Sequence, residues 1–472
     1  MSLTMRGLLV VCGLWVFGLS PALSYGQMPG MPASPEGLGG PSLTGAGVVV
    51  DADGVLRMQQ NPDKTGTLTR QRMQAAKAAL DPKVAKKSPL RKISLNRLEA
   101  ALKARLDNGQ KPTEDMQFLA GLTRVQYVFF IPETNDVILA GPAEGYVTNL
   151  VGRTQGLESG RPVLQLEDLV VALRAFFNDH NNPAPLIGCS IDPTKEGLAN
   201  MQAFLRNMGS RATPNQTQFI TNGLKESLGL QVVKLVGIPA KSHFAQVLVE
   251  ADYRMKLLGI GLEPIPVKGM QSYAARANPA AISKNALARW YFVPDYQCVK
   301  VAEDDLAMEL VGDGVKLVGA DELVQADGTR AKSAAVDLAS KGFTTDFTKN
   351  YAKIANQISV YWQMRNLIDL TVAVAFIKDR GYAEKAGWNM STFLSEKDYS
   401  VETQNVPAQV ETAVAAFWKG NRLVTPIGGG VHIEPAEAIK SANMQNDKDG
   451  TVAKARESIN VKDLPADQWW WD

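Results

Sequence analysis

The stretch VQYVFFIPETNDVIL, residues 125–139, decides the fold class of this chain. Valine, isoleucine, tyrosine and phenylalanine favour strands, and they lie on both sides of the polar segment Glu133-Thr134-Asn135. Two such runs separated by a short polar segment predict an antiparallel hairpin. A hairpin of this kind is typical of α+β folds and of mixed sheets.

Outward from the hairpin, strand-like and helix-like segments alternate. Leucines at helical spacing after Ser94, a plausible N-cap, are one example of a predicted helix. We expect helices at residues 68–80, 94–106, 164–177, 216–228 and 242–258, and strands at 185–191, 232–238, 288–293, 299–302, 308–311 and 315–318. This mixture predicts an α+β fold with packed helices and a mixed, largely antiparallel sheet; an α/β fold with a mixed sheet is the alternative.

Residues 335–380 predict a helical segment that is broken near residues 357–361. Its second half, residues 362–377, is apolar around most of its circumference, so we expect a buried helix there. Residues 408–417 and 422–427 then predict strands that return to a sheet.

The glycine run Gly428-Gly429-Gly430 is typical of a tight turn. A polar tail follows it and ends on Trp469-Trp470-Trp471. These tryptophans could stack on a sugar ring, but we favour their docking against the domain core.

The first 24 residues have the layout of a secretory signal peptide. Arg6 is their only charge, an apolar run follows it, and small residues supply a cleavage site after Ser24 or Gly26. Cys12 lies inside the apolar run, so we do not expect lipid attachment there. The sequence therefore predicts an exported protein, periplasmic or extracellular, with no membrane span after cleavage.

These features divide the chain into six segments. We expect a signal peptide at 1–24, a flexible tether rich in Pro, Gly and Met at 25–47, a basic N-terminal arm at 48–98, an α+β body at 99–330, a helical segment with returning strands of that body at 331–433, and a polar tail at 434–472. Within the arm, residues 47–58 predict a short hairpin or edge strand.

The chain has 472 residues, 45% of them hydrophobic, and a formal net charge of +2. An even charge balance argues against nucleic-acid binding. Residues 57–97, however, contain eleven Lys or Arg and two acids, a local charge of +9. This arm fits a solvated helical linker, and it also fits a segment that binds an anionic envelope polymer or lies along the acidic body of its own chain.

After cleavage the chain keeps two cysteines, Cys189 and Cys298. They could form one disulfide in an oxidising compartment, or remain two buried thiols, since both lie in apolar, strand-like surroundings. The count excludes a zinc site of the CxxC type.

Gly188-Cys189-Ser190-Ile191-Asp192 is the closest approach to a catalytic motif. A strand that enters a helix through a turn carrying Ser190 is the setting of a nucleophile elbow, but that motif needs glycine where Asp192 stands. We interpret Asp192 as an N-cap before Pro193. Cys189 is a second weak nucleophile candidate, with His180 or His243 as its base.

Paired carboxylates for glycoside cleavage could come from Asp252 and Glu263. We favour a simpler interpretation, in which Glu250–Arg254 and Asp252–Lys256 are surface ion pairs one helical turn apart.

We expect no metal and no cofactor. The three histidines, His180, His243 and His432, are too far apart in sequence to share one helix face. Residues 445–456 lack the ligands of a calcium loop, and Gly259-Ile260-Gly261 follows a helix instead of a strand, so it is no dinucleotide fingerprint.

The segment LVEADYRMKLLGIGLE, residues 248–263, resembles an uncharacterised family of exported bacterial proteins, domain of unknown function family 1598. The resemblance includes residues 188–197 and continues near residues 362–370, covering about 99–432. It implies export and a single large body. It supplies no activity and no catalytic residues.

Our first interpretation is therefore a non-catalytic binding or scaffolding protein of the cell envelope, whose basic arm contacts an anionic polymer or another envelope protein. One alternative is a secreted hydrolase of unfamiliar type that acts on peptide or glycan. Another is an extracytoplasmic small-molecule receptor, which would need an enclosed apolar cavity between lobes.

Overall fold

The structure is a computed structural model. It describes residues 47–50, 55–59, 63, 66–178, 185–208, 213–277, 286–320, 322–324, 330–332, 337–414, 418–419, 422–423, 428–461, 464–465 and 467–472. The signal peptide and most of the expected tether lie outside these residues.

One large sheet has eight strands in the order β1-β2-β17-β9-β8-β20-β11-β14. The pairs β11–β20 and β2–β17 are parallel, and the other neighbours are antiparallel. Its strands are β1 (Gly47–Val50), β2 (Val55–Gln59), β8 (Ile187–Asp192), β9 (Gln231–Val236), β11 (Arg289–Pro294), β14 (Val315–Gly319), β17 (Gln409–Val410) and β20 (Gly428–Ile433). The hairpin expected at residues 47–58 is confirmed by β1 and β2.

The second large sheet contains the hairpin predicted from residues 125–139, which is confirmed as β4 (Tyr127–Ile131) and β5 (Asp136–Ala143). The order of its seven strands is β21-β12-β13-β4-β5-β3-β22. The remaining strands are β3 (Ser88–Ser94), β12 (Val299–Val301), β13 (Ala307–Leu310), β21 (Gln445–Asn446) and β22 (Trp470–Trp471). Only β12 and β21 pair in parallel among the described strands of this sheet.

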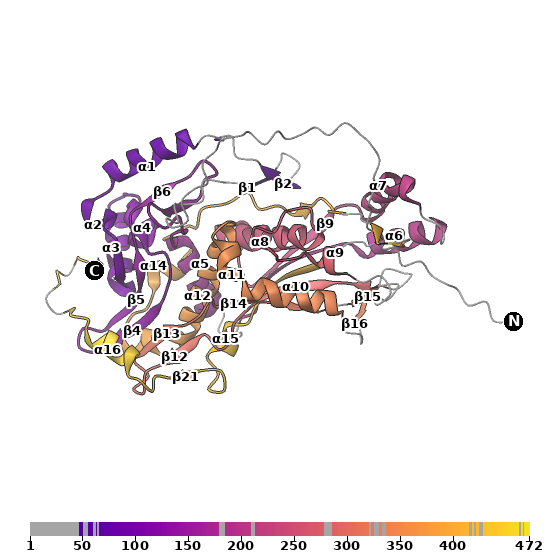
Figure 1. The fold of residues 1–472 in the computed structure, drawn as a ribbon. Coiled ribbons are helices and arrows are strands. Elements are labelled where there is room, and N and C mark those ends of the chain that lie inside the picture. Colours follow the sequence, from indigo (N-terminus) through magenta and orange to yellow (C-terminus); the bar gives the residue numbers. More distant parts are fainter. Residues whose placement is uncertain are drawn as a thin grey trace.

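Three long helices lie between the two sheets: α5 (Leu166–Phe177), α8 (His243–Ile260) and α12 (Val360–Asp379) (Figure 1). Residues of both sheets and of these helices form one continuous hydrophobic core. α12 is buried from Val360 to Ile377, which confirms the expected buried helix. The body is therefore one unit of the α+β class, as the mixture of segments predicts.

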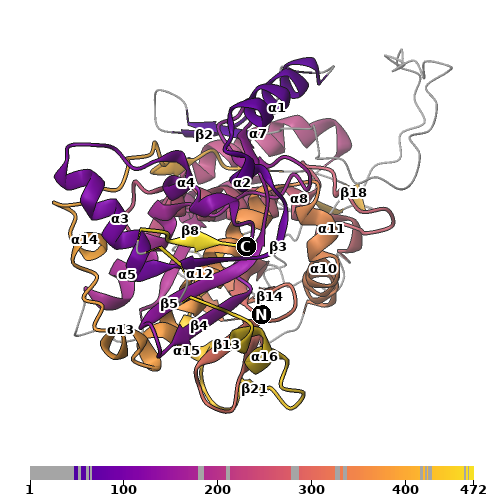
Figure 2. The same cartoon turned by 90° about the vertical axis from the view of Figure 1, so that its left-hand side faces the viewer.

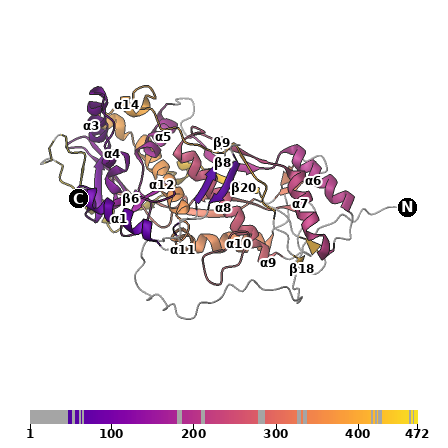
Figure 3. The same cartoon turned by 90° about the horizontal axis from the view of Figure 1, so that it is seen from above.

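Helices cover one face of the eight-stranded sheet (Figure 3). α8 packs on β8 and β20, and α10 (Leu338–Lys349) packs on β14. On the opposite face, Ser190, Lys234, Tyr291 and His432 are half-buried or exposed.

The remaining elements are short or peripheral. The helices are α1 (Thr67–Ala79), α2 (Pro82–Ala85), α3 (Leu95–Asp107), α4 (Glu114–Gln117), α6 (Lys195–Met208), α7 (Thr217–Leu228), α9 (Tyr273–Arg276), α11 (Tyr351–Ala355), α13 (Tyr382–Lys385), α14 (Ser391–Leu394), α15 (Pro435–Ala438) and α16 (Thr451–Glu457), with 3₁₀ turns at Leu119–Gly121 and Pro214–Gln216. The strands are β6 (Tyr146–Thr148), β7 (Thr154–Gly156), β10 (Ala286–Leu287), β15 (Glu322–Val324), β16 (Arg330–Lys332), β18 (Trp418–Lys419) and β19 (Arg422–Leu423).

The structure differs from the sequence-based expectation at the glycine run. Gly428-Gly429-Gly430 begins β20, a strand in the middle of the eight-stranded sheet, and is not a tight turn. Of the strand expected at 408–417, only Gln409–Val410 pairs, and residues 411–414 are irregular. The last three residues of the expected strand, 415–417, lie outside the described chain.

The basic arm is also more closely tied to the body than its expected limits of 48–98 imply. β3 is hydrogen-bonded between β5 and β22, and α3 spans the expected boundary between residues 98 and 99. α1 buries no residue, and it stands above the rest of this end of the molecule (Figure 2).

The terminal tryptophans dock, as expected. Trp470 and Trp471 form β22 along β3, and Trp469 and Trp471 are buried. Within the described ranges, no helix is long and apolar enough to span a bilayer.

Candidate functional site

Ser190 and Cys189 lie on opposite faces of β8, since successive side chains of a strand alternate. Cys189 is on the helix-covered face, and burial, followed by the nearby Asp252 carboxylate, raises the pKa of its thiol well above the ordinary value. A thiol in these surroundings is a poor nucleophile. Ser190 is half-buried within the strand and not on a strand-to-helix turn, so the geometry of a nucleophile elbow is not made.

The interpretation of Asp192 as an N-cap is wrong. α6 begins at Lys195, and the Thr194 hydroxyl accepts a hydrogen bond from the Gly197 amide at 2.9 Å. Asp192 is the last residue of β8, and its carboxylate pairs with Arg289 of β11 at 2.8 Å. Both side chains are buried, and a buried carboxylate needs a charged partner. Asp192 therefore pairs with Arg289, which is distant in sequence, and does not cap the following helix.

Asp252 and Lys256 pair as their spacing predicts, at 2.9 Å, but the expectation of a surface pair is wrong. Both are buried, because α8 lies between the sheet and α12 and is covered on nearly all sides. Lys256 also donates to the Ile191 carbonyl at 2.7 Å. Burial raises the pKa of Asp252 to about 6, against the opposing effect of Lys256.

Glu263 belongs to a separate buried pair with Arg254, with nitrogen and oxygen 2.5 Å apart. Arg254 also lies 3.6 Å from Glu250. Two residues along a helix turn the side chain by about 200°, so Asp252 and Arg254 leave α8 in different directions. Asp252 and Glu263 are therefore each held by a different cation, and the carboxylate pair considered for glycoside cleavage is not assembled.

The histidines lie in unrelated places. His180 is outside the described residues. His243 begins α8, and its Nδ1 lies 2.9 Å from the Asp168 carboxylate of α5. His432 is on β20, 2.6 Å from Glu434. Register places His432 opposite Gly188 and thus diagonal to Ser190 on the open sheet face.

The surroundings of His243 were not predicted from the sequence. Its Nε2 lies 3.2 Å from Gln165 and 3.3 Å from Gln363, so α5, α8 and α12 meet at this imidazole. Gln363 accepts from Arg153 at 2.8 Å, and Arg153 also contacts Glu250. Burial lowers the pKa of His243, but the Asp168 carboxylate raises it more, and the net shift is upward. Only the spacing of polar residues on otherwise apolar helices could have signalled this network.

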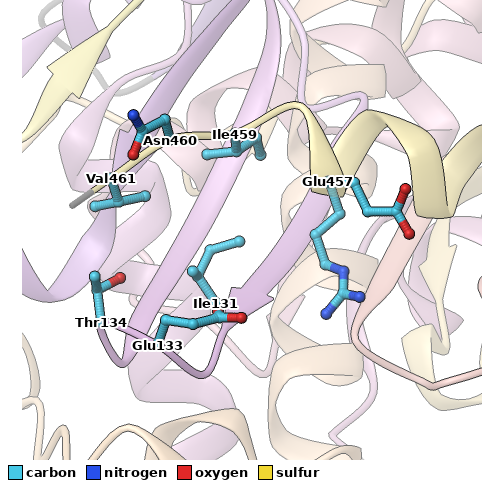
Figure 4. Close-up of a pocket in the computed structure, with 8 residues that line it drawn as sticks. Ile131, Glu133, Thr134, Glu457, Ile459, Asn460 and Val461 are labelled. Atoms are coloured by element: carbon cyan, nitrogen blue, oxygen red, sulfur yellow. The ribbon is translucent and has the colours of Figure 1, made fainter. Parts of the chain in front are cut away.

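A concave site lies elsewhere, between the β4–β5 turn and the end of α16 (Figure 4). Its volume is about 410 Å³. Its walls are partly apolar and partly polar: Ile131, Glu133, Thr134, Arg456, Glu457, Ile459, Asn460 and Val461. None of the predicted site residues lines it.

Two buried polar atoms in the walls of this pocket, Thr134 Oγ1 and Arg456 Nε, have no hydrogen-bond partner in the described part of the chain. Arg456 is held from its other edge by Asp304 at 2.7 Å. The pocket is thus large enough for a small molecule or ordered water. Among the residues that the structure places, no group of three His, Cys, Asp or Glu is arranged to hold a metal.

An exposed basic surface lies on α1. The helix has no buried residue and no acid in its first turn, and its cations Arg70, Arg72 and Lys77 are exposed. Among the residues that the structure describes, Arg72 bonds the main-chain carbonyls of Thr148 and Asn149, at 3.4 and 3.5 Å. Lys83 and Lys86 continue the basic surface just beyond the helix. We call these five side chains the basic platform.

Residues 189–273 match the model of a family described as Protein of unknown function (DUF1598). The matched segment runs from β8 to the start of α9 and contains the whole of α8. This confirms the resemblance seen in residues 248–263, and its wider extent stays a prediction. No match to the chain was found among curated proteins or among solved structures.

Proposed function

We propose that this chain, whose residues 189–273 match a family without a described activity, is an exported, non-catalytic binding protein of the cell envelope. Its basic platform would bind an anionic envelope polymer. Export rests on the signal-peptide layout of residues 1–24.

The observation that carries the proposal is the exposure of the platform. Within residues 67–87 the only acid is Asp81, and α1 buries no side chain in the body. In the described chain no ion pair joins Arg72 or Lys77 to an acid, so their charge is available to an external anion. Cations gathered on and just after one exposed helix attract a polyanion by their summed field.

Ion pairs inside the body support a binding role in a second way. Asp252, Glu263 and Asp192 each have a cation as partner. The Asp192–Arg289 pair joins β8 to β11, and Lys256, the partner of Asp252, joins α8 to β8 through the Ile191 carbonyl. Such carboxylates act in holding elements together, since a buried charge needs a partner.

Binding of the full chain to dextran sulfate, a soluble polyanion, and to isolated sacculi tests the proposal. We expect Arg70→Gln/Arg72→Gln/Lys77→Gln to weaken binding to dextran sulfate by about tenfold or more, since each cation near an anionic surface contributes about 1 kcal/mol. Glutamine keeps the helix propensity of the replaced residues.

The matched control is Lys341→Gln/Lys349→Gln/Lys397→Gln, which removes the same charge from exposed positions outside the platform. It should bind almost as the wild type does, and wild-type binding should weaken with added salt. Equal losses in the two triple variants, or no wild-type binding to either probe, would refute the proposal.

A hydrolase that uses Ser190 is a second candidate, because one observation favours it. His432 lies diagonal to Ser190 on the same sheet face and contacts Glu434, so a hydroxyl, an imidazole and a carboxylate share that face. Labelling of Ser190 by a fluorophosphonate, lost in Ser190→Ala and in His432→Gln, would support hydrolysis. No labelling at Ser190 would reject it.

A further inference from the structure

We infer that residues 469–472 are a latch that holds the basic platform in place. This inference rests on the proposed function, because it concerns how the same cations are positioned. The latch consists of β22 and the Asp472 side chain, and its receiver is Arg91 of β3.

Arg91 joins the latch to the platform through one guanidinium group. The side chain is fully buried, and its Nε donates to the Asp472 carboxylate at 2.8 Å. The same group donates to the main-chain carbonyls of Lys83 and Lys86, at 3.1 and 2.8 Å, and of Val84 at 3.1 Å. Those three carbonyls belong to α2 and the residue that follows it, so Arg91 fixes the segment to which α1 is attached.

Trp470 makes the second connection. The Arg91 guanidinium lies 4.6 Å from the centre of the Trp470 ring, a cation–π contact. Trp470 also packs against a small hydrophobic cluster that includes Val84 of α2, and Leu80, the residue between α1 and α2, packs on the same cluster. Residues 469–472 therefore contact the segment that carries α1 in two ways: through Arg91, and through the cluster that contains Val84 and Leu80.

The attachment of α1 through α2 matters because α1 buries no side chain, although it touches β6, where Arg72 bonds the Thr148 carbonyl. With no buried residue, the helix cannot hold its orientation by its own core contacts. Cations that are already held in position bind a polyanion without an ordering cost, whereas cations on a loose segment incur that cost on binding. The latch would thus raise affinity by preorganisation.

The latch can open without unfolding the body. β22 pairs with β3 through two residues only, Trp470 and Trp471, and it is the edge strand of its sheet. A two-residue edge strand opens at lower free energy than a strand inside the sheet. When β22 leaves β3, the buried Arg91 loses the Asp472 carboxylate as its partner. A buried cation without a partner is unfavourable, so the closed state of the latch is favoured.

Hydrogen–deuterium exchange and dextran sulfate binding of the full chain test the latch together. In Trp470→Ala/Asp472→Asn we expect the amides of residues 67–87 to exchange about tenfold faster, while exchange in α8 and α12 is unchanged. We expect binding to weaken by roughly three- to tenfold. Asp472→Glu, which keeps the charge, should restore slow exchange in residues 67–87.

Arg380→Gln is the control, because it breaks an ion pair with Asp305 that involves no residue of the latch or of the platform. Unchanged exchange in residues 67–87, or faster exchange throughout the body, would refute the latch. If the wild type fails to bind dextran sulfate, the proposed function falls, and the exchange of residues 67–87 still decides whether the latch exists.

Discussion

The burial of Asp252 depends on the position of α8 in the fold and not on the local sequence pattern. Its spacing to Lys256 is that of a solvent-exposed helical ion pair, yet both side chains are buried under β8. Burial disfavours the ionised carboxylate, and its pKa is raised to about 6. Asp192 and Arg289 are the other charges near it, with opposite effects on that pKa.

This shift predicts a pH dependence of stability. Between about pH 4 and pH 6 the folded chain keeps the Asp252 proton that the unfolded chain has lost, so this group stabilises the fold less as pH rises. Over that window the free energy of unfolding of the wild type should fall relative to Asp252→Asn by up to about 3 kcal/mol. Denaturant unfolding at several pH values measures this difference. The prediction would be contradicted if the free energies of unfolding of the two proteins changed in parallel between about pH 4 and pH 6.

The hydrogen bonds of Arg91 and Asp168 also depend on the tertiary fold. Neither stands in a motif, yet Arg91 serves four main-chain carbonyls and Asp472, while Asp168 orients His243. Their roles depend on partners that are far away in the sequence.

Among the elements, β20 departs furthest from its sequence pattern. Three glycines in succession indicate a turn when they are seen alone. In the sheet, however, Gly430 lies so close to β8 that a Cβ atom on it would stand 2.2 Å from the Cys189 carbonyl oxygen. Glycine at this position therefore allows β20 and β8 to lie close together, and it does not form a turn.

Gly430→Ala should therefore destabilise the protein by more than about 3 kcal/mol, since main-chain atoms on both strands would have to move. Gly342→Ala is the control: it lies inside α10, and the nearest atom is the end of the flexible Arg276 side chain at 3.0 Å. Alanine favours helix by up to about 1 kcal/mol, so this variant should be neutral or more stable. Thermal unfolding of both variants measures the difference, and equal shifts would contradict it.

At the scale of the whole molecule, the two sheets share one core through α5, α8 and α12. The two cysteines contribute to this core as separate side chains: both are free and buried. Of the two alternatives that the sequence leaves open, a bridge or two thiols, the structure has two thiols. Burial raises the pKa of Cys298 to about 12, and the nearby Asp369 carboxylate adds to the shift.

A thiol titration tests this arrangement. In a chain without residues 1–24, a thiol reagent should react slowly with the native protein and with two thiols per chain after denaturation without reductant. Added reductant should leave the thermal midpoint unchanged. Absence of reactive thiols until reductant is added would show that Cys189 and Cys298 are bridged.

The sequence by itself determined most helices and strands, the α+β class and the docking of the last tryptophans. These features depend on short-range patterns: the leucine spacing and Ser94 cap of α3, the polar turn of the β4–β5 hairpin, and the apolar circumference of α12. Only the tertiary structure decided which charges are buried and with what they pair, as Asp192 with Arg289 and Asp472 with Arg91 show. The physical reason is that desolvation and strand pairing depend on residues brought together from distant parts of the chain, and local spacing carries no record of them.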